Sequence, residues 1–145
     1  MKLNEAGINL IKTFEQCRLR AYPDPATGND PWTIGWGATG PDIKPGVVWT
    51  QDQADKRLAT DLNLVCNKIM PMIKTPLTDN QFSALVSFAY NLGEGHLHSS
   101  ALLKFINSGN IADAANEFPK WDRAAGKEMP GLLRRRLAEQ RLFKA

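Results

Sequence analysis

The sequence predicts a mainly helical α+β domain in which a small β-rich insert follows the first helix. Apolar residues recur at helical spacing before residue 16 and again after residue 50. Between them, residues 20–45 lack this period and contain nine glycines and prolines, which is typical of turns and short strands. The length of 145 residues corresponds to one domain. A domain of this size buries roughly 68–70% of the surface that its unfolded chain exposes.

A first amphipathic helix is expected over about residues 5–14, after a possible N-cap at Asn4. Glu15 lies just beyond the apolar stripe of this helix. In the insert, Tyr22 precedes a Pro-Asp-Pro sequence, and Trp32 begins the run WTIGWG. These features predict a short hairpin whose glycines allow other backbone or a ligand to come close.

Two capping boxes mark the start of the longer helices that follow. Thr50 with Gln53 opens a helix that continues to about residue 70, and Thr78 with Gln81 opens one that ends at Gly93. The second is apolar on most sides, so it is expected at the centre of the core. Shorter helices are expected over residues 101–107, 111–118 and 130–143.

The predicted architecture is one domain over residues 1–145 with two lobes and no interdomain linker. A small β-rich lobe covers about residues 16–49, and the helical lobe comprises residues 50–145 together with the N-terminal helix. A groove is expected where the insert meets the helical body, and the functional residues are expected to line it.

Composition excludes several classes of protein. Hydrophobic residues make up 43% and charged residues 23% of the chain, as in globular rather than disordered or fibrous proteins. Cys17 and Cys66 form no CxxC pair, so each is expected to be a small buried side chain in a reducing compartment. The polar N-terminus and the absence of an 18-residue apolar run lead us to expect neither an export signal nor a membrane anchor.

Most catalytic motifs are missing as well. His96 and His98 stand two residues apart without an HExxH motif or a matching Cys/His set, so no metal and no other cofactor is expected. The sequence also lacks a GxSxG elbow, a Walker loop and a GxGxxG motif after a strand. The chemistry left is acid–base catalysis by carboxylates.

Glu15 and Asp24 suit the two carboxylates of a glycoside hydrolase, in which one donates a proton and the other activates water or stabilises an oxocarbenium-like centre. Glu15 follows apolar residues that favour its protonated form, whereas Asp24 lies in a polar loop where it stays ionised. A helix-terminal Glu and a turn Asp are also common structural residues, so this spacing leaves both interpretations open.

Three ordered segments resemble phage-type lysozymes, the endolysins of glycoside hydrolase family 24. Phe14-Glu15, the run RLRAY at 18–22, Asp24 and the run WTIGWG at 32–37 resemble the catalytic segment. Residues 81–93 (QFSALVSFAYNLG) resemble the central helix, and residues 131–136 (GLLRRR) with Glu139 resemble the closing helix. The resemblance covers nearly the whole chain and implies a lysozyme-like fold with the active-site cleft between the two lobes.

The resemblance implies that Glu15 is the general acid, Asp24 the second carboxylate and Thr33 the hydroxyl that positions the attacking water. The family pattern places five residues between the Asp or Cys and the Thr, whereas eight separate Asp24 from Thr33 here. We interpret the difference as a longer hairpin tip at residues 26–30, which makes Asp30 a competitor for the second carboxylate. Ala38 stands where many relatives have His, so a structural partner is expected to be missing.

The implied substrate is peptidoglycan, cut at the β-1,4 bond between N-acetylmuramic acid and N-acetylglucosamine with lysis of the host cell. A water-positioning Thr fits an inverting reaction, for which the carboxyl groups lie about 6.5–9.5 Å apart rather than about 5–5.5 Å. The resemblance also implies that Gly37, Tyr90 and Ser100 line the substrate cleft. The four tryptophans are candidates for stacking on sugar rings, although most of them are expected to be core or rim residues.

Three alternatives are compatible with some of these residues. A lytic transglycosylase cuts the same bond with one Glu and without water, which leaves Asp24 and Thr33 unexplained. In a non-catalytic peptidoglycan-binding relative, Glu15 would only bond to backbone. A nucleic-acid binder fits least. The net charge of the chain is +3, and residues 134–145 hold five basic residues and one acid, so the rest of the chain is slightly acidic.

The basic C-terminal segment suggests an anionic outer-membrane surface as a second partner, through Arg134, Arg135, Arg136 and Arg141. The alternative is a solvated helix face on which Arg135 and Glu139 form an i,i+4 pair. The resemblance further implies a protein that stays in the host cytoplasm until a separate membrane-permeabilising protein releases it to the periplasm and cell wall. A monomer without nucleic-acid partners is expected.

Overall fold

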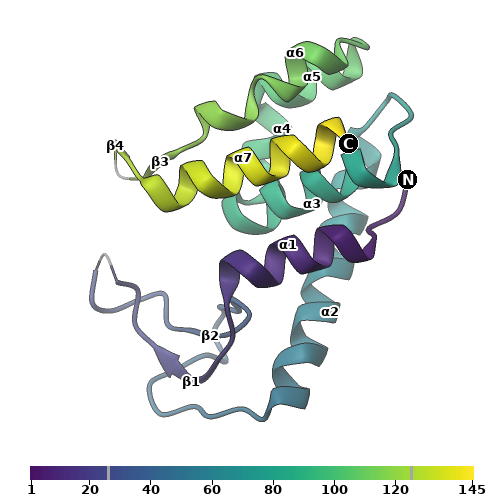
Figure 1. Ribbon diagram of the computed structural model, residues 1–145. Helices are drawn as coiled ribbons and strands as arrows, with labels where there is room; N and C mark the ends of the chain where they lie inside the picture. Colours follow the sequence, from purple (N-terminus) through teal and green to yellow (C-terminus); the bar gives the residue numbers. More distant parts are fainter. Residues whose placement is uncertain (26, 125) are drawn as a thin grey trace. The chain divides into compact units, whose positions relative to one another are not determined.

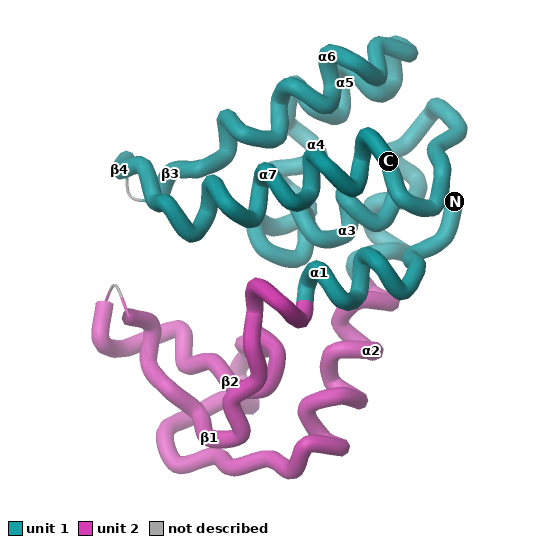
Figure 2. The backbone as a smooth tube through the Cα atoms, viewed as in Figure 1, with its two compact units in different colours: residues 1–11, 65–145 teal, residues 12–64 magenta. Residues whose placement is uncertain are grey.

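The computed structural model describes residues 1–25, 27–124 and 126–145. They form two compact units, unit 1 of residues 1–11 and 65–145 and unit 2 of residues 12–64 (Figure 2). Both α1 and α2 continue from one unit into the other. The main elements, in chain order, are α1 (Glu5–Glu15), β1 (Arg18–Tyr22), β2 (Thr33–Gly35), α2 (Gln51–Ile69), α3 (Asp79–Leu92), α4 (Glu94–Ser99), α5 (Ala101–Asn107), α6 (Ile111–Ala115), β3 (Arg123–Ala124), β4 (Lys127–Glu128) and α7 (Pro130–Lys144) (Figure 1).

The predicted mainly helical α+β fold is confirmed. Unit 2 extends to residue 64 and so includes most of α2, whereas the sequence pattern placed all of this helix in the helical lobe. The first two turns of α2 therefore belong to the same compact unit as the β-hairpin. This division matters because the hairpin carries three of the predicted site residues.

The predicted caps explain where α1 and α2 begin. The Asn4 side chain accepts a hydrogen bond from Gly7 N at 3.0 Å. Thr50 N donates to Gln53 Oε1 at 2.8 Å, and Gln53 N donates to Thr50 Oγ1 at 3.1 Å, which completes the capping box. At its other end α1 stops where Gln16 takes a left-handed φ of 55°, so the chain turns away immediately after Glu15.

In unit 2, β1 and β2 form the predicted hairpin, antiparallel and with an irregular register between their ends. On its other side β1 receives the segment at residues 47–49, because Ala21 N donates to Val47 O and Trp49 N to Leu19 O. A small apolar cluster lies beneath this sheet, formed by Ala21, Ile34, Ala38 and Ile43. The predicted longer tip includes Ala26, which lies outside the described residues.

In unit 1, α3 is the central helix, as the sequence predicts. Its capping box forms between Thr78 and Gln81, and residues 82–89 are all buried. It packs mainly against α7, and an aromatic cluster lies in the core, with Phe88 edge-on to Phe118 at 6.0 Å and Phe118 tilted on Phe143 at 5.3 Å. The core of this unit is thus built on one helix that is apolar on nearly every side.

The remaining differences are local. The helix predicted over residues 111–118 ends at Ala115, and a 3-10 turn follows over Phe118–Lys120, where Pro119 lacks the amide hydrogen that a helix needs. The short helix α4 was not predicted, because Leu97 alone is buried in it and one apolar residue makes no periodic pattern. Strands β3 and β4 were not predicted either, since each consists of two exposed residues.

Candidate active site

The Glu15 side chain lies directly against the backbone of Gly37 in unit 2. A Cβ on Gly37 would stand 2.5 Å from Glu15 Oε1 and 3.0 Å from its Cδ, and Gly37 has a φ of +92°. The strand register brings the two residues together, because Arg18 pairs with Gly35 and these lie shortly after Glu15 and shortly before Gly37. The conformation of position 37 favours glycine, and a Cβ there would force the Glu15 carboxylate to shift.

The other end of the same hairpin carries Thr33 and Asp24. Tyr22 pairs with Thr33 in the register, and Asp24 follows two residues later. Thr33 Oγ1 donates to Pro31 O at 3.3 Å. Asp24 is half-buried, whereas Asp30 is exposed. The three predicted catalytic residues thus belong to the hairpin and the helix end that leads into it.

The main chain around Asp24 is held by a compact turn. Asp24 N donates to Asn29 O at 2.9 Å, and Gly28 N donates to Asp24 O at 2.7 Å. Thr27 Oγ1 donates to Asp30 O at 2.9 Å and accepts from Asn29 N. These bonds connect residues 27–30 with one another and with Asp24. The strand pairing at Thr33 is present despite the longer spacing from Asp24.

Tyr22 interacts electrostatically with Arg18 and Glu15, which precede it in the chain. Burial raises the pKa of the Tyr22 phenol, the nearby Arg18 lowers it, and the negative charge of Glu15 raises it. The Arg18 guanidinium lies over the Tyr22 ring at 4.7 Å from its centroid. In the sequence Arg18 and Tyr22 belong to the RLRAY motif, and Tyr22 also precedes the Pro-Asp-Pro sequence of the hairpin, but neither had a predicted role in the site.

A second group of polar contacts surrounds Trp36, the residue next to Gly37. The indole N–H of Trp36 donates to Asp55 Oδ1 at 2.8 Å, and Gln51 Nε2 donates to the same oxygen at 3.0 Å. The Lys12 ammonium lies 5.3 Å from the Trp36 ring centroid. The Trp36 hydrogen bond, then that of Gln51, lower the pKa of Asp55. Nothing in the sequence pointed to Asp55 or Gln51, because both are ordinary polar residues on an exposed helix face.

The two remaining predicted site residues lie in unit 1. Tyr90 is half-buried near the end of α3, and its role as a substrate-binding residue stays a prediction. Ser100 is buried, donates to Leu97 O at 2.7 Å and accepts from Leu103 N at 3.1 Å. Its hydroxyl caps α5 and has these hydrogen bonds inside the protein, and its role as a substrate-binding residue stays a prediction.

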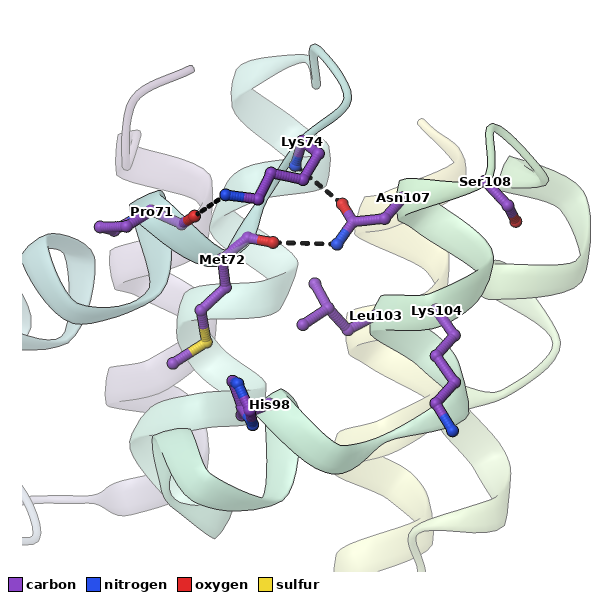
Figure 3. Close-up of a pocket in the computed structure, with 8 residues that line it drawn as sticks. All are labelled: Pro71, Met72, Lys74, His98, Leu103, Lys104, Asn107 and Ser108. Atoms are coloured by element: carbon purple, nitrogen blue, oxygen red, sulfur yellow. Dashed lines mark hydrogen bonds between the residues drawn. The ribbon is translucent and has the colours of Figure 1, made fainter.

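Unit 1 has a surface pocket of about 640 Å³ that contains none of the predicted catalytic residues (Figure 3). On its wall Asn107 accepts from Lys74 N at 2.8 Å and donates to Met72 O at 2.9 Å. Lys74 Nζ donates to Pro71 O. The lining residues are Pro71, Met72, Lys74, His98, Leu103, Lys104, Asn107 and Ser108.

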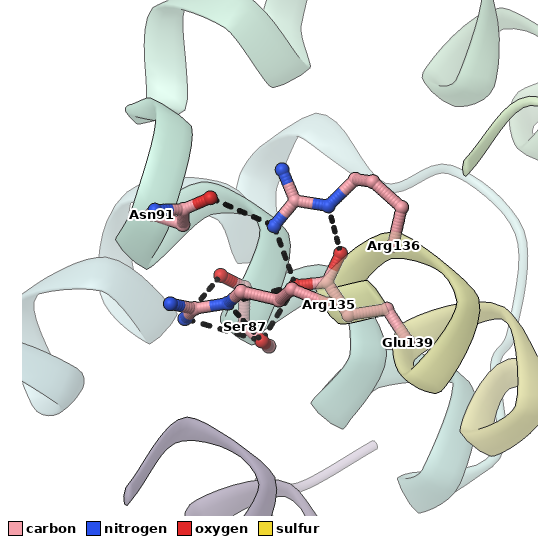
Figure 4. Close-up of polar contacts among 5 residues, drawn as sticks. All are labelled: Ser87, Asn91, Arg135, Arg136 and Glu139. Carbon is pink, nitrogen blue, oxygen red and sulfur yellow. Dashed lines mark hydrogen bonds and ion pairs between the residues drawn. The ribbon is translucent and has the colours of Figure 1, made fainter. Parts of the chain in front are cut away.

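The arginines predicted to face an anionic surface divide into two pairs. Arg135 and Arg136 are buried, with 4% and 0% of their surface exposed, whereas Arg134 and Arg141 are exposed. Both buried guanidinium groups bind the buried carboxylate of Glu139, with Arg136 Nε at 2.7 Å from Oε1 and Arg135 Nε at 3.4 Å from Oε2 (Figure 4). Arg135 and Arg136 are therefore not available to a membrane, and the Arg135–Glu139 pair is not on a solvated face, which corrects both expectations.

Two neutral partners complete this buried network. Ser87 Oγ donates to Glu139 Oε2 at 2.6 Å, and Arg136 Nη2 donates to Asn91 Oδ1 at 2.8 Å. The sequence could not show that Arg135 and Arg136 are buried while Arg134 is exposed. The burial depends on which face of α7 is covered by α3, and the three arginines are consecutive and identical in type.

Two other kinds of site are absent from the part of the chain that the structure describes. In residues 1–25, 27–124 and 126–145, no three or more His, Cys, Asp and Glu side chains come together as metal ligands would. No helix formed by these residues combines the length and the apolar character needed to cross a membrane.

Cys17 and Cys66 are free thiols and only half-buried, which corrects the expectation that both are buried.

Comparisons with known proteins agree with the fold. Residues 12–139 match the Phage lysozyme family. The chain is 46% identical over 143 residues to the endolysin of Bacillus phage PZA, covering 99% of this chain and 55% of that protein. It is 40% identical over 149 residues to the endolysin of Acyrthosiphon pisum secondary endosymbiont phage 1, covering 100% of this chain and 99% of the relative.

A solved structure has a similar fold. The muramidase domain of SpmX from Asticaccaulis excentricus has a TM-score of 0.88 and 36% identity, and the alignment covers 99% of this chain and 98% of that chain. The chain spans about half the length of the Bacillus phage relatives it matches and nearly the whole of the endosymbiont phage endolysin. Since the family match extends over residues 12–139, the chain belongs to the phage lysozyme family.

Proposed function

We propose that this chain is a muramidase of the endolysin type, which hydrolyses the β-1,4 bond between N-acetylmuramic acid and N-acetylglucosamine in bacterial peptidoglycan. The observation that carries the proposal is the placement of Glu15, whose carboxylate lies against Gly37 at one end of a hairpin that holds Asp24 and Thr33 at its other end. Membership of the phage lysozyme family supports the same substrate and bond.

In the proposed reaction the proton of Glu15 passes to the glycosidic oxygen as the bond to the sugar breaks. Asp24 stabilises the positive charge that develops on the sugar and helps to deprotonate the attacking water, which Thr33 positions. The half-burial of Asp24, next to a hydrogen-bonded turn, supports this role. Attack from the face opposite the leaving group gives inversion at the anomeric carbon.

The test is turnover of purified peptidoglycan with analysis of the products. Wild-type protein should release fragments with new reducing ends, and Glu15→Gln should lower the rate by about 10²-fold or more with the fold retained. Glu5→Gln is the matched control, because Glu5 lies exposed at the other end of the same helix. Equal rates for wild type and Glu15→Gln would remove Glu15 as the acid.

The same assay separates the alternatives. Anhydromuramoyl ends in place of reducing ends would identify a lytic transglycosylase, and binding of the wall without release of fragments would identify a non-catalytic relative. For the hydrolase, NMR of freshly cleaved oligosaccharide should show the α-anomer first, as inversion of a β-linkage requires. The β-anomer first would indicate retention.

A contribution of surface charge to wall access is also proposed, restricted to Arg134 and Arg141. Both are exposed on α7, and Leu137 on the same helix is 41% exposed. A cationic and partly apolar face of this kind is suited to an anionic lipid surface. Replacing both arginines with Gln should reduce killing of intact Gram-negative cells more than lysis of stripped walls. Equal effects would contradict the proposal.

We propose further that the chain reaches the wall from the host cytoplasm only after a separate membrane-permeabilising protein acts. The endolysin relatives support a role in phage lysis. Expression in a bacterial host should leave the culture intact until such a permeabilising protein is also expressed, when turbidity should fall. Lysis by the chain alone, with Glu15→Gln inactive in the same cells, would contradict this route.

A further inference from the structure

We infer that Trp36 and Asp55 are positioning residues for the general acid: Asp55 fixes the Gly35–Trp36–Gly37 turn and thereby holds Gly37 against the Glu15 carboxylate. The inference rests on the proposed function, because it concerns the acid of that reaction. Neither residue touches the reacting atoms in this arrangement. Their effect passes through the backbone of Gly37.

The turn needs an anchor because of its own sequence. Gly35 and Gly37, on either side of Trp36, have φ values of +64° and +92°. Glycine populates many backbone conformations, so this arrangement is only one of several that the isolated segment can adopt. Backbone bonds between Ile34 and Ala38 close the base of the turn at 2.8 and 3.0 Å, and Gly35 also pairs with Arg18, so the backbone pairing holds the two ends of the turn.

The side chain of Trp36 adds a constraint at the middle of the turn. Its indole N–H donates to Asp55 Oδ1 at 2.8 Å, a hydrogen bond to a charged acceptor. Its ring lies near the Lys12 ammonium, which stands on α1 one turn before Glu15. The side chain is therefore fixed both to α2 and to the helix that carries the acid.

Gln51 connects Asp55 with Cys17, which follows Glu15 in the chain. Its amide donates to Asp55 Oδ1 at 3.0 Å and lies 3.6 Å from Cys17 Sγ. Cys17 is two residues after Glu15, in the segment that follows the left-handed Gln16. The first two turns of α2 thus contact both the chain leaving Glu15 and the turn that faces it.

The role predicts an effect on kcat rather than on substrate binding. Asp55→Ala and Trp36→Phe each remove the hydrogen bond, and each should lower kcat on peptidoglycan by about 10-fold or more, because small misplacements of a catalytic group are costly. KM should stay within about twofold of the wild-type value. The double variant should lose no more than either single variant, since both remove one interaction. Asp55→Asn, which keeps an acceptor oxygen, should recover most of the lost rate.

Gln53→Ala is the matched control. It removes the capping box of the same helix but contacts neither Trp36 nor Asp55 in the hydrogen bonds of the structure. It should lower Tm as much as Asp55→Ala does, with kcat near the wild-type value at a temperature well below Tm. If Gln53→Ala lowers kcat as much as Asp55→Ala, or if the losses of Asp55→Ala and Trp36→Phe multiply, the positioning role is contradicted.

A readout independent of turnover separates this inference from the proposed function. In ¹⁵N-resolved NMR spectra, Asp55→Ala should shift or broaden the backbone amide signal of Gly37, and Gln53→Ala should leave it in place. An unmoved Gly37 signal in Asp55→Ala would overturn the positioning role even in an active enzyme. A wild-type protein that does not cleave peptidoglycan would instead overturn the proposed function, whatever the NMR result.

Discussion

Glu15 and Gly37 are in such close contact that the carboxylate occupies the space in which any other residue at position 37 would place its Cβ. That atom would lie 2.5 Å from Oε1, a distance that Cβ contacts essentially never show. The acid that ends α1 is thereby confined by a neighbour that has no side chain. A side chain at position 37 would therefore displace the Glu15 carboxylate, which makes the contact open to direct test.

Gly37→Ala should abolish most of the activity, by about 10²-fold, because the new methyl group forces Glu15 to move. Gly46→Ala provides the control, since Gly46 has a similar φ of +88° but a Cβ added there would meet nothing within 4 Å. Both variants carry the strain of a left-handed alanine, so their unfolding free energies should fall by similar amounts. Activity retained in Gly37→Ala but not in Gly46→Ala would contradict the contact.

The second carboxylate can be assigned by comparing two aspartates of the same hairpin tip. Asp24→Asn should lower kcat by about 10²-fold, whereas Asp30→Asn should change it less than twofold, because Asp24 is half-buried beside the turn and Asp30 is exposed. Reducing-end assays on purified peptidoglycan measure both. The reverse ranking would transfer the role to Asp30.

Titration of Asp55 should be visible in the indole N–H signal of Trp36. Because the indole donates to the carboxylate, the pKa of Asp55 is lowered, so the midpoint of the shift should fall below the ordinary Asp value of about 3.9. A lowered pKa means that the stabilising bond is complete above the ordinary pKa and weakens as the pH falls through the folded-state value. An NMR titration from pH 6 to pH 2 tests this, and a midpoint above 4 would contradict the assignment.

Glu139→Gln should destabilise the protein strongly. It leaves the buried guanidinium groups of Arg135 and Arg136 without their negative partner, a change that typically costs about 3–5 kcal/mol. Glu128→Gln is the comparison, because it removes an ion pair to Arg123 in which both side chains are mostly exposed, and such pairs contribute about 0–1 kcal/mol. Urea unfolding gives both values, and similar losses would show that the buried network is not stabilised by charge.

The fold could be predicted from the sequence where a short sequence pattern corresponds to one local structure. The capping boxes at Thr50 and Thr78 marked the start of α2 and α3, since a hydroxyl followed three residues later by Gln satisfies the free amides of a helix end. The Glu15, Asp24 and Thr33 set depended on resemblance, because single carboxylates at helix ends and in turns are common.

What could not be predicted depends on packing between distant segments. Arg135 is separated by 48 residues from Ser87, its hydrogen-bond partner, and only the contact of α7 with α3 shows that it is buried. Asp55 likewise becomes part of the site through a contact with Trp36, 19 residues before it. The burial of Ser100 was not predicted either, because a serine that caps a helix and a serine that lines a cleft have the same local sequence.

The anchor for the Trp36 turn sits at a helix terminus, and termini are the first parts of a helix to fray. Gln51 and Asp55 lie in the first two turns of α2, so fraying of this stretch would release the turn that faces the Glu15 carboxylate while the core around α3 stays folded. On warming, cleavage of peptidoglycan should therefore be lost at a lower temperature than the helical signal in circular dichroism.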